Sequence, residues 1–218
     1  MLSERVQDAR RTWARLAGLM YLLVLVVDLT GMQFPRAPLG RSLILTGSVL
    51  TVPLALGLYF TLRIFQPSTA RVALACRLVE AATGILGTVA GFRVVSAGLA
   101  ASHPGTAILQ LVAWNKATNF GALIFTIGST LFFFLFVQSA SIPRFLSWLG
   151  LVASLIAFGA CAAHLIRPQF PAMSIAAWIP MLLAEVSTGG WLLIRAVDPV
   201  LAPASTLHRR GEETISPG

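Results

Sequence analysis

Long apolar runs, separated by short breaks, make up most of the chain. A helix needs about 20 apolar residues to cross a hydrocarbon core of about 30 Å. Every break contains proline, which ends a helix because it lacks an N–H donor and restricts the residue before it. The pattern predicts an all-α protein, a bundle of six transmembrane helices near residues 13–32, 42–65, 71–99, 115–138, 144–166 and 173–195.

The composition agrees with this pattern. Of the 218 residues, 56% are hydrophobic and 11% are charged, whereas about one quarter of a soluble domain is charged. We therefore expect the lipid bilayer to be the main partner of the chain. The sequence leaves the oligomeric state open.

The two ends of the chain are more polar than its middle. We divide the chain into an N-terminal segment at 1–12, a six-helix transmembrane domain at 13–196 and a tail at 197–218 that we expect to be disordered. Arg10 and Arg11 precede an apolar run, as in a secretory signal, but no small-x-small cleavage site follows. We therefore expect the first helix to be retained.

The sixteen basic residues lie mainly at the ends of the apolar runs. They form no patch with interleaved aromatic residues, so the net charge of +8 does not indicate nucleic-acid binding. Cytoplasmic flanks hold the excess of Lys and Arg, and counting on alternate sides predicts that both termini are cytoplasmic. One side carries Arg5, Arg10, Arg11, Arg15, Arg63, Arg71, Arg77, Arg144, Arg195, Arg209 and Arg210, and the other Arg36, Arg41, Arg93, Lys116 and Arg167.

Small and polar residues recur on one face of five predicted helices. Helices in lipid associate through small residues and interhelical hydrogen bonds, so these faces should point into the bundle. They comprise Ala14, Ala17, Gly18, Tyr21 and Asp28; Thr46, Pro53 and Gly57; Ala73, Arg77, Glu80, Gly84, Gly87, Gly91 and Gly98; Asn115, Asn119, Ala122, Thr126 and Thr130; and Ser147, Gly150, Ser154, Ala157 and Cys161. Close packing alone would explain them, and contact with a ligand is the alternative.

Three carboxylates lie inside apolar runs: Asp28, Glu80 and Glu185. An acid at such depth is usually paired, neutral or facing a cavity. At 1.5 Å per residue, Glu80 and Glu185 lie at similar depth. Arg77 precedes Glu80 by one helical turn, and we favour an arrangement in which it bridges both glutamates. The cluster would then be either a proton-handling site or a polar contact that only holds the helices in register.

Two further polar residues are candidates for the same interior. Asp28 lies near the depth expected for His164, and the two could form an outer pair. Asn119 lies on the polar face of the fourth predicted helix. These residues, with Arg77 and the two glutamates, make up the set that we expect to bind a ligand or handle protons.

Recognised cofactor chemistry is absent from the sequence. His103, His164 and His208 are isolated, which leaves haem and zinc without a ligand motif. No glycine-rich phosphate loop or nucleophile elbow occurs. We therefore expect no cofactor and no metal.

Four segments together resemble a known family of bacterial membrane proteins. They read ARLAGLMYLL at 14–23, RLVE at 77–80, IPR at 142–144 and AE leading to WLL between 184 and 193. In this order and spacing, they resemble domain of unknown function family 4386. The resemblance implies a six-helix bundle in a bacterial inner membrane, draws attention to Glu80, Glu185 and Arg144, and implies no activity. Ala184 stands where glycine is more typical of the family.

Three functions remain open at this point. The chain could bind or transport a small or lipid-like molecule, with the carboxylates handling protons. It could instead be an intramembrane enzyme acting on an isoprenoid-like substrate, with a glutamate as general acid. The run of four phenylalanines at 132–136 gives little support for an aromatic-lined pocket, because it winds around its helix and we expect at least half to face lipid. The third hypothesis is that the chain is a structural or accessory subunit.

Overall fold

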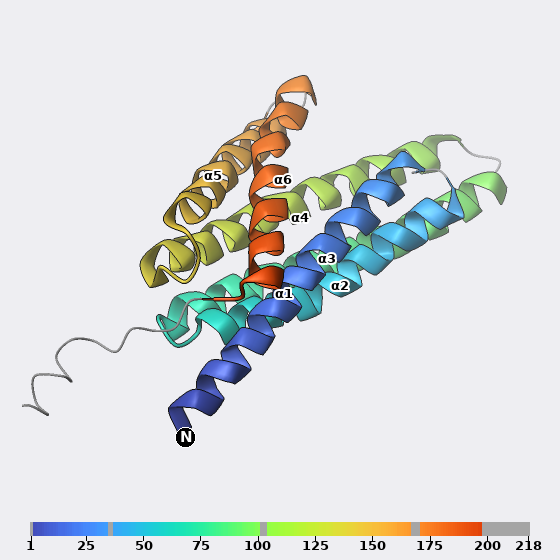
Figure 1. The fold of residues 1–218 in the computed structure, drawn as a ribbon. Helices are drawn as coiled ribbons and strands as arrows, with labels where there is room; N and C mark the ends of the chain where they lie inside the picture. The colour runs from blue at the N-terminus through green and yellow to red at the C-terminus, as the bar shows by residue number, and fades with distance from the viewer. Residues whose placement is uncertain (1, 35–36, 101–103, 167–170, 198–218) are drawn as a thin grey trace, which may run out of the picture.

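Six helices form the fold in a computed structural model of the chain (Figure 1). The structure describes residues 2–34, 37–100, 104–166 and 171–197, with side chains described for 4–34, 37–89, 120–166 and 176–197. No strand occurs among these residues. The helices are α1 (Leu2–Gln33), α2 (Pro38–Leu62), α3 (Pro67–Ala100), α4 (Pro104–Ser139), α5 (Arg144–Ile166) and α6 (Pro171–Ile194).

The helix ends follow the proline signals in the sequence. Four of the six helices begin at a proline, namely α2, α3, α4 and α6, where the missing N–H has no partner to lose. Within the described residues, all six are long and apolar enough to cross a membrane. The chain therefore has the form of a multi-pass membrane protein.

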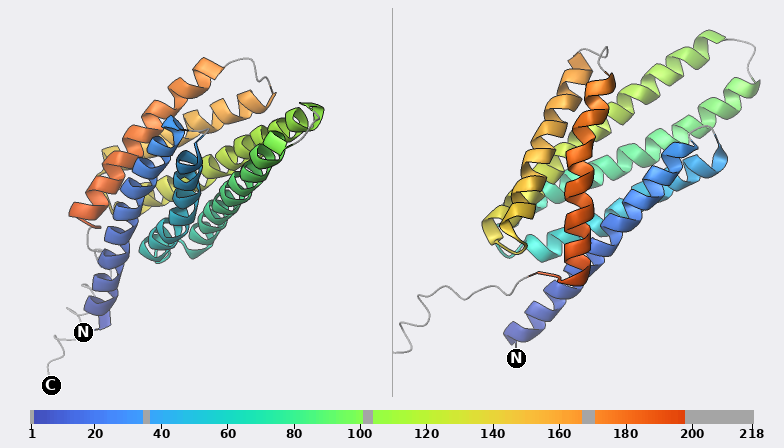
Figure 2. Two further views of the ribbon diagram at one scale, coloured as in Figure 1. Left: turned by 90° about the vertical axis from the view of Figure 1, so that its right-hand side faces the viewer. Right: turned by 45° about the horizontal axis from the view of Figure 1, so that its top comes forward.

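The helices are arranged as a ring in chain order. Each helix packs against its neighbours in the sequence, and α1 also packs against α6, which closes the ring. Figure 2 shows α1 lying between α2 and α6. Across the ring, α2 and α4 alone share close backbone contacts among the described residues.

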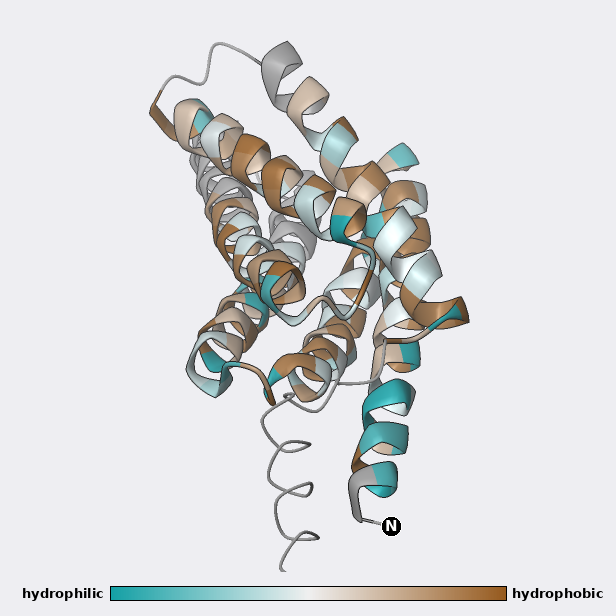
Figure 3. Cartoon of the chain, turned by 60° about the vertical axis from the view of Figure 1, so that its left-hand side comes forward, coloured by the Kyte–Doolittle hydropathy of each residue, from teal (hydrophilic) through white to brown (hydrophobic). Residues whose placement is uncertain are grey.

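Apolar side chains cover much of the outside of the ring. Large exposed side chains include Leu86, Phe145 and Ile194, each at least 68% exposed, which would be costly in water but not in lipid. Figure 3 shows hydrophilic residues gathered at the start of α1 and hydrophobic residues along the helices. The outer surface is suited to a lipid environment.

The small and polar faces predicted from the sequence mostly point inward. The whole predicted face of α5 is buried, as are four of the five residues predicted for α1. Thr46 is an exception: it is exposed, and its hydroxyl donates to its own helix, to Ser42 O at 2.8 Å. That part of the prediction for α2 was wrong.

The phenylalanine run of α4 is more buried than its spacing suggested. Phe132, Phe133 and Phe136 are about 1% exposed, and only Phe134 is 39% exposed. The expectation that half of them face lipid was wrong because α4 packs against α2 as well as α3 and α5. These rings pack into the hydrophobic core.

Glycine allows α1 and α6 to approach closely where the ring closes. A Cβ at Gly18 would lie 2.5 Å from Leu193 N and 2.6 Å from Gly189 O. Backbone therefore meets backbone with no side chain between, as in other close helix crossings in membranes. Tyr21, one turn further along α1, packs over Gly189.

Arg10 ties three parts of the fold together at one end of the ring. It is 3% exposed, and its Nε donates to Thr61 O of α2 at 3.0 Å. Its Nη2 donates to Ser141 Oγ, between α4 and α5, at 2.5 Å, and its guanidinium lies 5.0 Å from the centre of the Phe65 ring. The sequence suggested only a role in topology for this residue.

Candidate functional site

The central polar site is built around Arg77 of α3. Its side chain is 2% exposed, and its Nη1 lies 3.0 Å from Glu80 Oε2 on the next turn of the same helix. Within the described residues, neither atom meets the geometric criteria of a hydrogen bond with any partner. The pair is therefore a close charge contact that leaves hydrogen-bonding capacity unused.

Residues from α1 and α6 complete the electrostatic surroundings of Arg77. Tyr21 of α1, Glu185 of α6 and Asp28 of α1 lie near enough to influence its charge. Glu185 is 7% exposed and also interacts with Glu80 and Asp28. The structure thus brings three predicted acids from three helices around one arginine. We name Tyr21, Asp28, Arg77, Glu80 and Glu185 the central cluster.

The predicted bridge between the two glutamates takes a looser form than expected. Arg77 makes its close ion pair with Glu80, whereas Glu185 influences its charge without a salt bridge to it among the described residues. The reason is the i,i+3 spacing within α3, which lets Arg77 reach Glu80 without crossing the ring.

The structure does not bring Asp28 and His164 together. Between their described residues, α1 and α5 share no close backbone contact. Asp28 packs instead against Gly47 of α2, where an added Cβ would overlap its Oδ1, and it interacts with Arg77. His164 lies in the last turn of α5, half-buried, and its Nδ1 has no hydrogen-bond partner within the described residues. Similar depth did not imply proximity.

Aromatic rings and a glycine hold Arg77 in place. Its guanidinium lies 4.6 Å from the centre of the Phe125 ring on α4, a cation–π contact strengthened by burial. Phe125 in turn packs on Trp178 of α6, with 5.5 Å between ring centres. Gly128 leaves room for the stem of Arg77, since a Cβ there would approach it to 3.3 Å.

Several buried polar atoms around the ring lack a hydrogen-bond partner in the described part of the chain. They include Nε of Arg77 and the hydroxyls of Ser129 on α4 and Thr188 on α6. Both hydroxyl residues are 1% exposed or less. A buried donor without a partner costs about 1–3 kcal/mol, and more when it is charged. Such atoms need a partner from outside the described chain.

The charges of the central cluster do not balance. Three carboxylates surround one guanidinium, so full ionisation would leave two negative charges in a medium of low dielectric constant. Among the described residues, no group of three or more His, Cys, Asp or Glu side chains is arranged to hold a metal ion. Full ionisation of all three carboxylates in this buried site would therefore be costly.

A comparison with protein families identifies one family that matches most of the chain. Residues 36–196 match the model of a family described as a domain of unknown function, DUF4386. The chain belongs to this family. No curated protein and no solved structure matches it.

The DUF4386 match divides the central cluster. Arg77, Glu80 and Glu185 lie within the matched residues, whereas Tyr21 and Asp28 precede them. The segment at 14–23, which contributed to the resemblance seen in the sequence, also lies before the match. The part of the site on α3 and α6 therefore falls within the family domain, and the part on α1 does not.

Sequence reasoning missed two residues of the site and named others that lie elsewhere. Tyr21 was identified only as a packing residue, although it lies seven residues before Asp28 and so shares its helical face. Phe125 gave no signal, because one aromatic residue in an apolar run is ordinary. The side chain of Asn119 is outside the described residues. Arg144 is exposed at the start of α5, away from the central cluster.

Proposed function

We propose that this chain binds a small or lipid-like molecule inside the ring of helices and handles protons at the same place. The observation that carries the proposal is the buried guanidinium of Arg77, whose Nε has no hydrogen-bond partner among the described residues. A charged donor buried in this way is costly unless an acceptor meets it. A ligand oxygen would supply that acceptor.

The ligand should combine a polar oxygen with an apolar body. The unpartnered hydroxyls of Ser129 and Thr188 add polar groups on α4 and α6, while Phe125 and Trp178 offer aromatic surface beside Arg77. This mixture of a few polar groups with aromatic walls is typical of small-molecule sites. Transport rather than binding alone would require the ring to open alternately to the two sides.

Proton handling follows from the charge balance. Three acids share one arginine, and a ligand that enters or leaves changes which of them can stay ionised. Binding should therefore be coupled to the uptake or release of protons. These protons would be exchanged with the cytoplasm at the end of the ring where α1, α3 and α5 begin.

We further propose that the chain resides in a bacterial inner membrane with both termini in the cytoplasm. The support is the concentration of arginine at the end of the ring where α1, α3 and α5 begin, together with the rule that cytoplasmic flanks are the more basic. Fusion of a reporter active only in the cytoplasm to each terminus tests this orientation. The orientation is contradicted if the reporter is inactive at either terminus while a second reporter, which works only outside the cytoplasm, is active there.

The binding proposal can be tested by native mass spectrometry of the protein purified in mild detergent. The wild type should carry a bound small molecule, and Glu80→Gln and Glu185→Gln should each reduce its occupancy about tenfold or more, as the loss of a charged interaction of about 1.5–3 kcal/mol implies. Asp8→Asn is the matched control, because Asp8 is an exposed acid near the start of α1. It should leave occupancy unchanged.

Proton coupling can be tested with the same variants in vesicles that enclose a pH-sensitive dye. Adding the molecule identified by mass spectrometry should change the internal pH with the wild type and Asp8→Asn, but not with the Gln variants. Wild-type protein without any bound molecule, or Gln variants that retain both binding and the pH change, would contradict the proposal. Gln variants that lose only thermal stability would instead indicate a structural subunit.

A further inference from the structure

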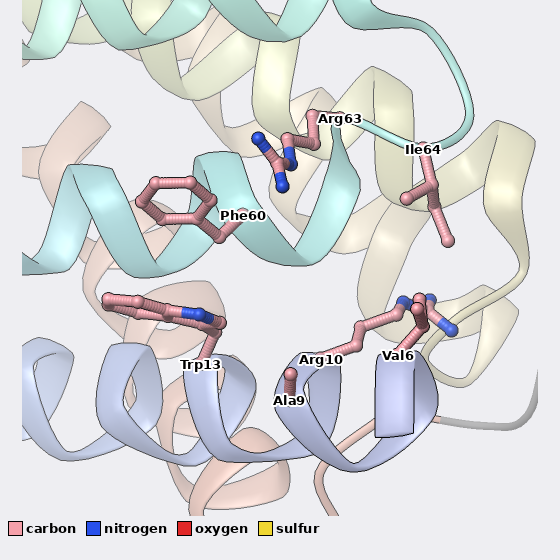
Figure 4. Close-up of a pocket in the computed structure, with 7 residues that line it drawn as sticks. All are labelled: Val6, Ala9, Arg10, Trp13, Phe60, Arg63 and Ile64. Atoms are coloured by element: carbon pink, nitrogen blue, oxygen red, sulfur yellow. The ribbon is translucent and has the colours of Figure 1, made fainter. Parts of the chain in front are cut away.

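A groove between the start of α1 and the end of α2 lies apart from the central cluster. It has a volume of about 140 Å³ and is lined by Val6, Ala9, Arg10, Trp13, Phe60, Arg63 and Ile64. Figure 4 shows Trp13 and Phe60 facing each other across the two helices, with Arg63 beside them and Val6 and Ile64 further along. The groove is thus an apolar slot with arginine beside it.

The floor of this groove is rigid. Trp13 stacks on Phe60 with 4.6 Å between ring centres, which joins α1 to α2. Arg10 is fixed at one side by its bonds to Thr61 O and Ser141 Oγ. A slot with fixed walls loses little entropy when a chain enters it.

Arg63 is the charged group available to a ligand. It is exposed, and its guanidinium lies 4.7 Å from the centre of the Phe60 ring and 5.9 Å from that of Tyr59. Stacking on an aromatic face leaves the N–H edge of a guanidinium free to bind an anion. No carboxylate is among the residues that line the groove.

The groove lies where a lipid headgroup would meet it. Phe60 lies in the last turn of α2, and Trp13 lies near the point where the charged beginning of α1 gives way to its apolar run. Tryptophan favours the interface with water. Basic pockets between transmembrane helices on the cytoplasmic side bind anionic headgroups. Exposed Val6, Ala9 and Ile64 leave the apolar slot open along one side.

We infer that this groove binds an anionic phospholipid, with the phosphate at Arg63 and the upper part of an acyl chain in the apolar groove alongside the stacked rings of Trp13 and Phe60, next to Val6, Ala9 and Ile64. The assignment rests on the complementarity of the exposed guanidinium of Arg63 to a phosphate and of the apolar groove to a lipid chain. It is independent of the function proposed for the central cluster.

The test compares two lipids on the full-length protein in detergent by native mass spectrometry. Phosphatidylglycerol and phosphatidylcholine with identical acyl chains are added in turn, and the wild type should retain the former preferentially. Arg63→Gln should lower phosphatidylglycerol binding about fivefold, as expected from about 1 kcal/mol per arginine near a lipid surface. Arg71→Gln is the matched control, since Arg71 is an exposed arginine at the start of α3, outside the groove.

A second variant tests the slot without changing charge. Ala9→Leu places a larger apolar side chain in the groove and should lower phosphatidylglycerol binding severalfold while thermal stability is retained. Equal retention of the two lipids by the wild type, or no effect of either Arg63→Gln or Ala9→Leu, would overturn the inference. So would equal competition by inorganic phosphate, which would indicate a site for a free anion.

Discussion

The closure of the ring between α1 and α6 makes a sharp prediction about Gly18. A Cβ at this position would lie 2.5 Å from Leu193 N and 2.6 Å from Gly189 O, whereas ordinary contact begins at 3.4 Å. Both atoms belong to the backbone of α6, which cannot rotate out of the way. Gly18→Ala should therefore push the two helices apart by roughly 0.9 Å and weaken their dispersion contacts.

The expected loss can be bounded from general values. Overpacking in a well-packed interior costs about 1–3 kcal/mol, and replacing glycine by alanine within a helix returns up to about 1 kcal/mol. We expect Gly18→Ala to lower the free energy of unfolding by about 1–2 kcal/mol. Gly190→Ala is the control in α6, because an added Cβ there meets nothing within 4 Å. It should range from neutral to slightly stabilising.

The measurement is unfolding of the purified protein in mild detergent by titration with sodium dodecyl sulfate, followed by tryptophan fluorescence. The prediction concerns the difference between the two alanine variants, so any general effect of alanine on helix stability cancels. If Gly18→Ala is as stable as Gly190→Ala, then α1 and α6 do not cross with their backbones in contact. The closed ring, and with it the packing of Tyr21 over Gly189, would have to be abandoned.

Two further substitutions test other contacts of the ring by the same unfolding titration. Gly150→Ala should lower the free energy of unfolding by about 1–3 kcal/mol because its Cβ would overlap the ring of Phe133. Gly159→Ala on the same helix is the control, since an added Cβ there meets open space. Equal stability of these two variants would argue against the packing of Phe133 on Gly150. Arg10→Gln should cost about 3 kcal/mol through the loss of buried charged hydrogen bonds, while the exposed Arg11→Gln should stay within about 0.5 kcal/mol. If Arg10→Gln is as stable as Arg11→Gln, the hydrogen bonds of Arg10 do not stabilise this end of the ring.

The depth of the polar residues could be estimated from the sequence, but their neighbours could not. Counting residues along a helix gives height in the membrane because the rise per residue is constant. It does not say which helix stands beside which. Depth alone allowed Asp28 and His164 to form a pair, yet α1 packs between α2 and α6, so Asp28 packs on Gly47 and lies near Arg77 instead.

The contacts of Phe125 and Arg10 could not be predicted either, because nothing in the sequence distinguishes these residues from others of the same kind. Phe125 is one of thirteen phenylalanines, and nothing in its local sequence marks it as the ring that covers Arg77. Arg10 was interpreted as one positive charge among several at the cytoplasmic side. Its burial depends on Thr61 and Ser141, which are distant in the chain and come within reach only when the ring closes.

The sequence by itself determined that the chain is helical, that it has six membrane-length helices, and that most small or polar residues on the described helix faces point inward. These properties follow from hydrophobic length, proline breaks and helical periodicity, all of which are local along the chain. Only the tertiary structure decided the order of helices around the ring, and hence that Tyr21, Asp28, Glu80 and Glu185 share Arg77. That order depends on close backbone approaches such as the one at Gly18, which involve residues far apart in sequence and leave no periodic signal.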